Sequence, residues 1–306
     1  MTQETDSSTA TQEIQNQSII EADNLLGQYI PLHYHFQMLE DEGRMAGFKA
    51  AIDYLVPDGG RVLDMGAGTG VLSFLAAQKA AKVYSVERQP EMVQCARTLL
   101  EENGCGDTVE LIQADARDYL PPEPVDVVVC EMLHSALLRE KQVEVIQSFK
   151  GRYREKFGDK MPIFIPDTTI LGVEPVYANF SYQGYQAPIS FFEDPGALSE
   201  RYLSLGEAKP YCILEYQEEA PTTLNFDESI SIHTNGRFNA LRFITKNLLS
   251  VNLNSGKTVD WMNLNLILPI KKSLDAEAGN QFHVSFSYQA GGEIQALKNS
   301  IEVIKA

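Results

Sequence analysis

The stretch VLDMGAGTG, residues 62–70, joins the end of an apolar run to three glycines and the start of a helical pattern. Gly66, Gly68 and Gly70 permit a tight turn and let the backbone pass close to a bound ligand. Asp64 lies just before the first of them. The stretch therefore predicts the first strand-loop-helix unit of an α/β domain, with a ligand site at the end of the strand.

Apolar runs alternate with helical patterns over residues 60–165. The runs are RVLDMG, KVYSVE, VELIQAD and VDVVVCE, and the helical patterns are VLSFLAAQKA, PEMVQCARTLLEEN and VEVIQSF. This alternation is typical of βαβ units, which form a parallel sheet with helices on both faces. Upstream of it, residues 35–55 have apolar residues at helical spacing and predict one amphipathic helix.

The pattern changes after residue 165. The rest of the chain is mainly strand-like, with period-two alternation in WMNLNLIL and FHVSFSY. We therefore predict a Rossmann-like α/β domain with an N-terminal helical segment at 24–165, followed by a β-barrel or β-sandwich domain at 166–306. Residues 1–23 are acidic, rich in Thr, Gln and Ser, and free of Lys and Arg, and they predict a disordered tail.

Composition restricts the class of protein. A chain of 306 residues, 44% of them hydrophobic, can bury a sizeable core. A net charge of -17 disfavours nucleic acid and favours cationic partners, although it also serves solubility. The apolar runs are too short to cross a membrane, and no secretory signal is visible. The four cysteines lack CxxC spacing, so we expect reduced thiols, no metal site and a cytoplasmic protein.

The strand KVYSVE ends in an acid, Glu87, at a position where a carboxylate can accept hydrogen bonds from ribose hydroxyls. An adenosine cofactor fits this pattern. The DxGxGxG form, Glu87, and Asp115 after the third strand together resemble the class I S-adenosylmethionine-dependent methyltransferases. The resemblance implies that S-adenosylmethionine is the cofactor and that Asp115 and Ala116 lie at its adenine. An NAD site and a glycine turn without a ligand are the alternatives.

The stretch CEMLHSALLRE, residues 130–140, contains two glutamates, Glu131 and Glu140. Glu131 ends the fourth strand of the series, at the edge of the sheet where ligands bind. A carboxylate there prefers a cationic partner, and a planar guanidinium with five N–H groups can satisfy two carboxylates. Alternatively, Glu131 accepts backbone N–H bonds and Glu140 is a solvated acid that pairs with Arg139 or Lys141.

This pair resembles the double-glutamate loop of the protein arginine N-methyltransferases, in which eight residues separate the two glutamates. The resemblance implies that Glu131 and Glu140 bind the acceptor guanidinium, that Arg44 binds the methionine carboxylate of the cofactor, and that Tyr29 closes over the site. It extends over most of residues 29–306. Residues that match the N-terminal helix of the family are His35, Met38, Leu39, Asp41, Glu42 and Arg44.

Other positions depart from the family. Its Thr-His-Trp loop reads Val259, Asp260, Trp261 here, so an acid replaces the histidine that pairs with the helix aspartate, Asp41. Two carboxylates at close range repel each other unless a cation or a shared proton separates them. We therefore expect either a different geometry or a cationic substrate group between Asp41 and Asp260. Trp261 either packs in the β domain or lines the substrate site.

Between the two glutamates, Met132 and Leu133 replace the Trp and Met that the family often has. We assign Met132, Leu133 and His134 to the substrate side, and His134 is either a general base or a packing residue. The predicted activity is methylation of a guanidino nitrogen of arginine in a protein or peptide. Methylation of free arginine or another guanidine or amine metabolite, and a cofactor-binding module without catalysis, are the alternatives. The segment YANFSYQGYQAPISFF is short for a dimerisation arm, and a dimer remains possible.

Overall fold

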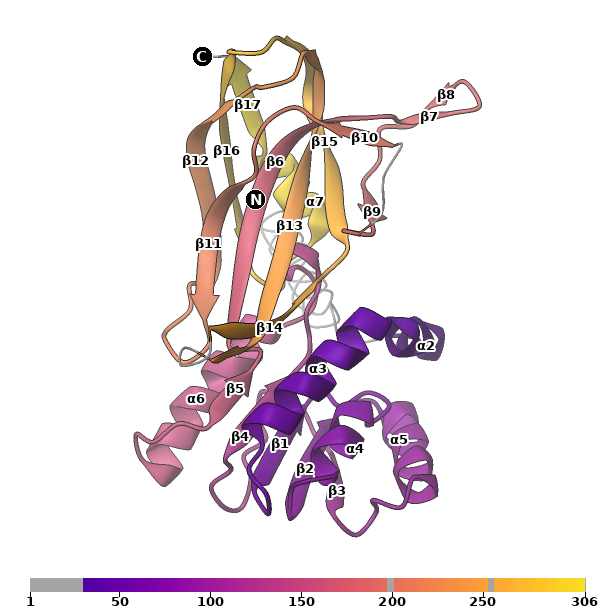
Figure 1. The fold of residues 1–306 in the computed structure, drawn as a ribbon, viewed down its shortest axis with the longest axis vertical. Coiled ribbons are helices and arrows are strands. Elements are labelled where there is room, and N and C mark those ends of the chain that lie inside the picture. The colour runs from indigo at the N-terminus through magenta and orange to yellow at the C-terminus, as the bar shows by residue number, and fades with distance from the viewer. Residues whose placement is uncertain (1–29, 197–200, 253–255, 306) are drawn as a thin grey trace, which may run out of the picture.

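The computed structural model describes residues 30–196, 201–252 and 256–305. An α/β part and a β part lie one above the other along the longest axis of the molecule (Figure 1). The predicted disordered tail, residues 1–23, and Tyr29 lie outside the described residues. Within the described residues, no helix has the length and apolar character that a membrane span requires.

The α/β part contains a five-stranded parallel sheet in the order β3-β2-β1-β4-β5, which confirms the predicted parallel architecture. The chain runs from β1 to β2 on one side and later returns to β4 on the other, so the strand order switches between β1 and β4. Ligands bind at such a switch point, beyond the carboxyl ends of the strands. The elements are β1 (Arg61–Met65), α4 (Val71–Ala77), β2 (Lys82–Glu87), α5 (Pro90–Glu102), β3 (Val109–Gln113), β4 (Val127–Cys130), α6 (Gln142–Phe157) and β5 (Ile163–Ile165).

The N-terminal segment forms two helices, α2 (Leu32–Glu40) and α3 (Glu42–Leu55), and the prediction of a single helix was wrong. Asp41 leaves the helical conformation, with ψ 88°, and its carboxylate accepts a hydrogen bond from the backbone N–H of Arg44 at 2.9 Å. An aspartate that caps a helix in this way competes with helix continuation through the same position. The break turns α2 away from α3 and places α2 and the start of α3 beside the carboxyl ends of the sheet (Figure 1).

The β part contains a seven-stranded and a three-stranded antiparallel sheet. Phe243 and Phe286 bring the sheets together with ring centroids 5.2 Å apart, as do Phe238 and Phe282 at 5.4 Å, so the sheets pack face to face as in a sandwich. A small hairpin, β7–β8, projects from this part (Figure 1). The elements are β6 (Thr168–Ala178), β7 (Ser181–Tyr182), β8 (Tyr185–Gln186), β9 (Phe191–Glu193), β10 (Tyr202–Ser204), β11 (Lys209–Glu215), β12 (Thr223–Ser231), β13 (Gly236–Asn252), β14 (Lys257–Met262), β15 (Asn265–Ala276), β16 (Gln281–Gln289), α7 (Ile294–Ser300) and β17 (Glu302–Lys305).

Two features of the β part differ from the sequence pattern. The longest strand, β13, was not among the predicted strands, because polar residues such as Arg242 and Asn247 interrupt its apolar alternation. Inside the fold they are paired, Arg242 with Glu174 and Asn247 with Asn263. The run WMNLNLIL is divided between β14 and β15, which continue along the same edge of β13 and are interrupted at Asn263 and Leu264. The side chain of Asn263 donates to the carbonyl of Leu133 at 2.6 Å instead.

Candidate active site

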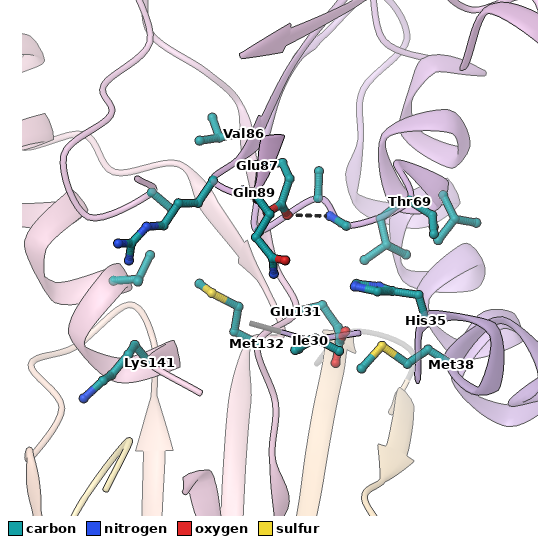
Figure 2. A pocket seen from close by; sticks show the side chains of 18 of the residues that line it. Ile30, His35, Met38, Thr69, Val86, Glu87, Gln89, Glu131, Met132 and Lys141 are labelled. Atoms are coloured by element: carbon teal, nitrogen blue, oxygen red, sulfur yellow. Dashed lines mark hydrogen bonds between the residues drawn. The ribbon is translucent and has the colours of Figure 1, made fainter. Parts of the chain in front are cut away.

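A pocket opens at the carboxyl ends of β1, β2 and β4, beside α2 and α3. Its walls come from separate elements that the fold brings together. Figure 2 shows His35 and Met38 on one side of the pocket, Glu87 and Gln89 across from them, and Glu131 and Met132 at its lower edge. The pocket thus lies at the switch point of the sheet, as the glycine stretch predicted.

The glycine loop binds Glu87 at the rim of the pocket. The N–H of Gly68 donates to one carboxylate oxygen of Glu87 at 3.0 Å (Figure 2), and the N–H of Gln89 donates to the other at 2.8 Å. Gly68 has a φ of +54°, and a Cβ at this position would lie 2.8 Å from Cε1 of His35. Only glycine combines this backbone conformation with so close an approach. The fixed carboxylate of Glu87 retains lone pairs for ligand hydroxyls.

His35 is a site residue to which the sequence assigned no role of its own. Its Nε2 is buried without a hydrogen-bond partner, and the side chain lines the pocket. Burial lowers the pKa of His35 below its ordinary value, although the charge of Glu87 opposes this effect and that of Arg44 adds to it, so the ring is neutral at physiological pH. A buried polar atom that lacks a partner and faces a pocket indicates a ligand that supplies one. In the sequence, the one signal for His35 was its match to the histidine of the family's N-terminal helix.

Asp64 and Gly70 belong to the structure behind the loop, since neither lines the pocket. The hydroxyl of Ser73 donates to the Asp64 carboxylate at 2.6 Å, which joins the start of α4 to the end of β1. Burial raises the pKa of Asp64 to about 7. Gly70 begins α4 with a φ of +83° and packs closely against Leu100. Both residues therefore support the ligand loop from behind.

Asp115 and Ala116 line the far end of the pocket, where the adenine was predicted. The guanidinium of Arg117 donates to both oxygens of Asp115, at 3.0 and 2.7 Å, and Arg88 lies 3.4 Å away. The hydrogen bond from Arg117 lowers the pKa of Asp115, so this carboxylate is charged. Arg117 was missed in the sequence, where an arginine two positions after an acid in a loop has no distinctive pattern.

Arg44 and Glu131 form an ion pair that crosses from α3 to the end of β4. The Arg44 guanidinium also lies 5.0 Å from the ring centroid of Trp261. Only one oxygen of Glu131 is used, because Oε1 is buried without a partner. Burial raises the pKa of Glu131, although Arg44 acts in the opposite direction. The pocket thus contains a carboxylate with unused acceptor capacity beside a long cationic side chain.

Glu140 lies near Glu131 at the other end of the loop. Burial raises its pKa to about 8, and the negative charge of Glu131 acts in the same direction. Within the described residues, no ion pair joins Glu140 to Arg139 or Lys141, and Lys141 lies nearest to Glu144, at 3.9 Å. The fold therefore does not show Glu140 as a solvated acid paired with Arg139 or Lys141 at the surface. Glu140 does not itself line the pocket but lies beside Lys141, which does. Two neighbouring carboxyl groups with raised pKa values beside a pocket are typical of a functional site.

Of the two alternatives for Asp41 and Asp260, the structure has the different geometry, in which Asp260 does not face Asp41. Asp260 pairs with Lys246 at 2.7 Å and is partly exposed, whereas the indole N–H of Trp261 donates to Asp41 at 3.1 Å. Successive side chains of a strand point to opposite faces, so Asp260 and Trp261 of β14 cannot both face α3. Tryptophan thereby supplies Asp41 with the donor that an acid at position 260 cannot supply.

The three residues after Glu131 lie in different surroundings. Met132 lines the pocket, and its Cγ would lie 3.0 Å from a Cβ on Gly66, so it sits on the cofactor side. Leu133 is buried in the core. His134 packs edge-on against Phe192 of β9 at 5.5 Å, and burial lowers the pKa of its ring to about 4. His134 therefore connects the loop to the β part as a neutral packing residue.

Comparisons with known proteins agree with this geometry. A family model described as a methyltransferase domain matches residues 62–155. An uncharacterized protein of Methanothermobacter thermautotrophicus is 32% identical over 269 residues, which cover 88% of this chain and 97% of the relative. Protein arginine N-methyltransferase 2 of Xenopus tropicalis is 29% identical over 189 residues, which cover 60% of this chain and 42% of the relative.

Among solved structures, the PRMT1 enzyme-prozyme heterotetrameric complex of Trypanosoma brucei with AdoHcy has a similar fold, with a TM-score of 0.69 and 16% identity. The match covers 89% of this chain and 96% of the other. The pocket of this chain offers groups that suit S-adenosylmethionine, namely acceptor oxygens on Glu87, an unpaired Nε2 on His35 and a cation on Arg44. The chain therefore belongs to the same family as the Methanothermobacter protein, and it is an S-adenosylmethionine-dependent methyltransferase that resembles the protein arginine N-methyltransferases.

Proposed function

We propose that this enzyme methylates a guanidino nitrogen of arginine in a protein or peptide. The observation that carries the proposal is the state of the two carboxyl groups. Glu131 has a buried oxygen without a partner, and burial and mutual repulsion raise the pKa of Glu140. A flat cation with several N–H donors relieves both conditions at once, because it pairs with each carboxylate and offsets their repulsion.

The protein contributes to the reaction by positioning and by electrostatics. S-adenosylmethionine supplies, when bound, an electrophilic methyl group on a sulfonium sulfur. Glu131 and Glu140 hold the guanidinium and attract its positive charge toward the nitrogens they contact, so that the free nitrogen retains a lone pair for attack. Glu140 is also suited to receive the proton that the methylated nitrogen loses, because its raised pKa makes it a stronger base than an ordinary glutamate.

A small guanidine or amine metabolite is the second candidate acceptor. The loss of the family histidine at position 260 and the short segment in place of the dimerisation arm permit it. Incubation with labelled S-adenosylmethionine, arginine-containing peptides and free arginine separates the two. We expect label in peptides and formation of demethylated cofactor. Label confined to free arginine identifies the small-molecule enzyme, and cofactor binding without turnover identifies a non-catalytic module.

The rate should depend on pH through Glu140. With a pKa of about 8, only a minor fraction of Glu140 is ionised at pH 7 in the free enzyme. We therefore expect kcat/KM for the guanidine acceptor to rise about tenfold between pH 7 and pH 9, because the arginine substrate stays charged over this range. Glu140→Gln should lose this dependence. An unchanged pH profile in that variant would contradict the assignment.

A further inference from the structure

The loop from Glu131 to Glu140 is fixed by the β part over most of its length. The side chain of Asn263 donates to the carbonyl of Leu133 at 2.6 Å, and the hydroxyl of Ser135 donates to the carbonyl of Leu264 at 2.6 Å. The following residues of the loop are bound in the same way, with Ala136 N–H donating to Thr245 Oγ1 at 2.6 Å and the Tyr288 hydroxyl donating to the Ala136 carbonyl at 2.9 Å.

The loop also has an unusual backbone. Ala136, Leu137 and Arg139 have φ values of 57°, 51° and 60°, in the left-handed region that residues with a side chain rarely adopt. Such conformations cost free energy and persist only where surrounding structure imposes them. The hydrogen bonds from the β part provide that constraint. The segment before Glu140 therefore depends on the β part for its conformation.

The end of the loop meets a glycine turn between β16 and α7. The N–H of Gly291 donates to the carbonyl of Leu137 at 2.7 Å, and the N–H of Arg139 donates to the carbonyl of Gly292 at 2.8 Å. Gly291 has a φ of +75°, and a Cβ there would lie 3.2 Å from the carbonyl oxygen of Glu140 and 2.9 Å from Cδ of Lys141. The turn thus lies directly against the backbone of Glu140.

The two glutamates are held by different parts of the molecule. At the Glu131 end, the amide of Gln142 in α6 accepts from the N–H of Met132 at 2.9 Å and donates to the carbonyl of Cys130 at 2.8 Å. At the Glu140 end, no side-chain bond to the carboxyl group is found within the described residues, so its position depends on the backbone of the loop. The distance between the two carboxyl groups is then decided by how the β part sits on the sheet.

We propose that the Gly291–Gly292 turn, with Tyr288, is the element that positions Glu140 opposite Glu131, and that Gly291 and Tyr288 are positioning residues for the acceptor guanidinium. The inference rests on the proposed function and adds residues of the β part, far along the chain from the loop, to the machinery that determines the acceptor geometry. A displacement of Glu140 should affect the guanidinium and leave the ribose contact of Glu87 in place.

Gly291→Ala tests this proposal against Gly279→Ala. Gly279 lies in the turn between β15 and β16 and has a φ of +92°, and a Cβ added to it would meet no atom within 4 Å. The two variants therefore share the backbone cost and differ in the close contacts that the added Cβ of Gly291→Ala makes with the carbonyl of Glu140 and the side chain of Lys141. We expect Gly291→Ala to lower kcat by about 10- to 100-fold, because small misplacements of reacting groups have effects of this size. Gly279→Ala should keep the kcat of the unchanged enzyme. Equal kcat losses in both variants would overturn the proposal.

A second measurement needs no turnover. Carbon NMR of labelled glutamate carboxyl groups follows the titration of Glu140. We expect the midpoint of this titration to shift in the Gly291→Ala and Tyr288→Phe variants and to stay unchanged in Gly279→Ala. Thermal unfolding confirms that each variant is folded. If the midpoint stays in both Gly291→Ala and Tyr288→Phe, the positioning role is rejected. If it shifts while no guanidine is methylated even by the unchanged enzyme, the proposed function fails, whereas the positioning of Glu140 by the turn stands.

Discussion

Replacing Glu131 by glutamine is expected to lower the rate of methyl transfer to a guanidine by about 1000-fold, since preorganised electrostatic groups that act on a transition state contribute roughly this much. Glutamine keeps the shape of the side chain and its place at the end of β4, but it has no charge to hold the guanidinium. Cofactor affinity should change much less than the rate, because the substitution leaves Arg44, Glu87 and His35 in the pocket wall. Single-turnover rates and calorimetric titration with the cofactor measure the two effects separately.

Asp260→Asn is the matched control for Glu131→Gln. It also removes one negative charge near α3, but Asp260 pairs with Lys246 and does not line the pocket. The rate of methyl transfer in this variant should stay close to that of the unchanged enzyme. A Glu131→Gln enzyme that is as active as Asp260→Asn would show that the carboxylate has no part in acceptor binding.

Replacing Arg44 by methionine is expected to reduce the free energy of unfolding by about 3 kcal/mol at pH 9, because loss of one partner leaves a buried carboxylate uncompensated. The loss should be smaller at pH 6. Without Arg44 the pKa of Glu131, already raised by burial, rises further, and a carboxyl group with a raised folded pKa loses stability as pH increases. Urea unfolding at the two pH values measures the difference, and a loss independent of pH would contradict this account.

Arg44→Met should also weaken cofactor binding by roughly 10- to 100-fold, the usual range for a lost hydrogen bond to a charged group. Arg242→Met is the matched control, because Arg242 pairs with buried Glu174 and lies 5.0 Å from the ring centroid of Tyr202, much as Arg44 lies over Trp261. It should destabilise the fold and keep the cofactor affinity. Equal cofactor affinities in both arginine variants would exclude Arg44 from the cofactor site.

The sequence alone determined the features that follow from local pattern. The glycine loop, the alternation of strands and helices, and the acids at the ends of β2 and β4 predicted a parallel sheet with a ligand site at its switch point. These features are readable because each depends on a few adjacent residues, a fixed period, or a strand that ends at a known edge of the sheet. The resemblance to arginine methyltransferases rested on spacings of the same local kind.

The tertiary structure decided which side chains meet. It showed that Trp261, and not residue 260, faces Asp41, that Arg44 pairs with Glu131, and that β13 is a buried strand despite its polar residues. It also brought Gly291 against Glu140. Contacts of this kind depend on how elements far apart in the chain pack against one another. A polar residue whose partner comes from another element therefore has no signature in its own stretch of sequence.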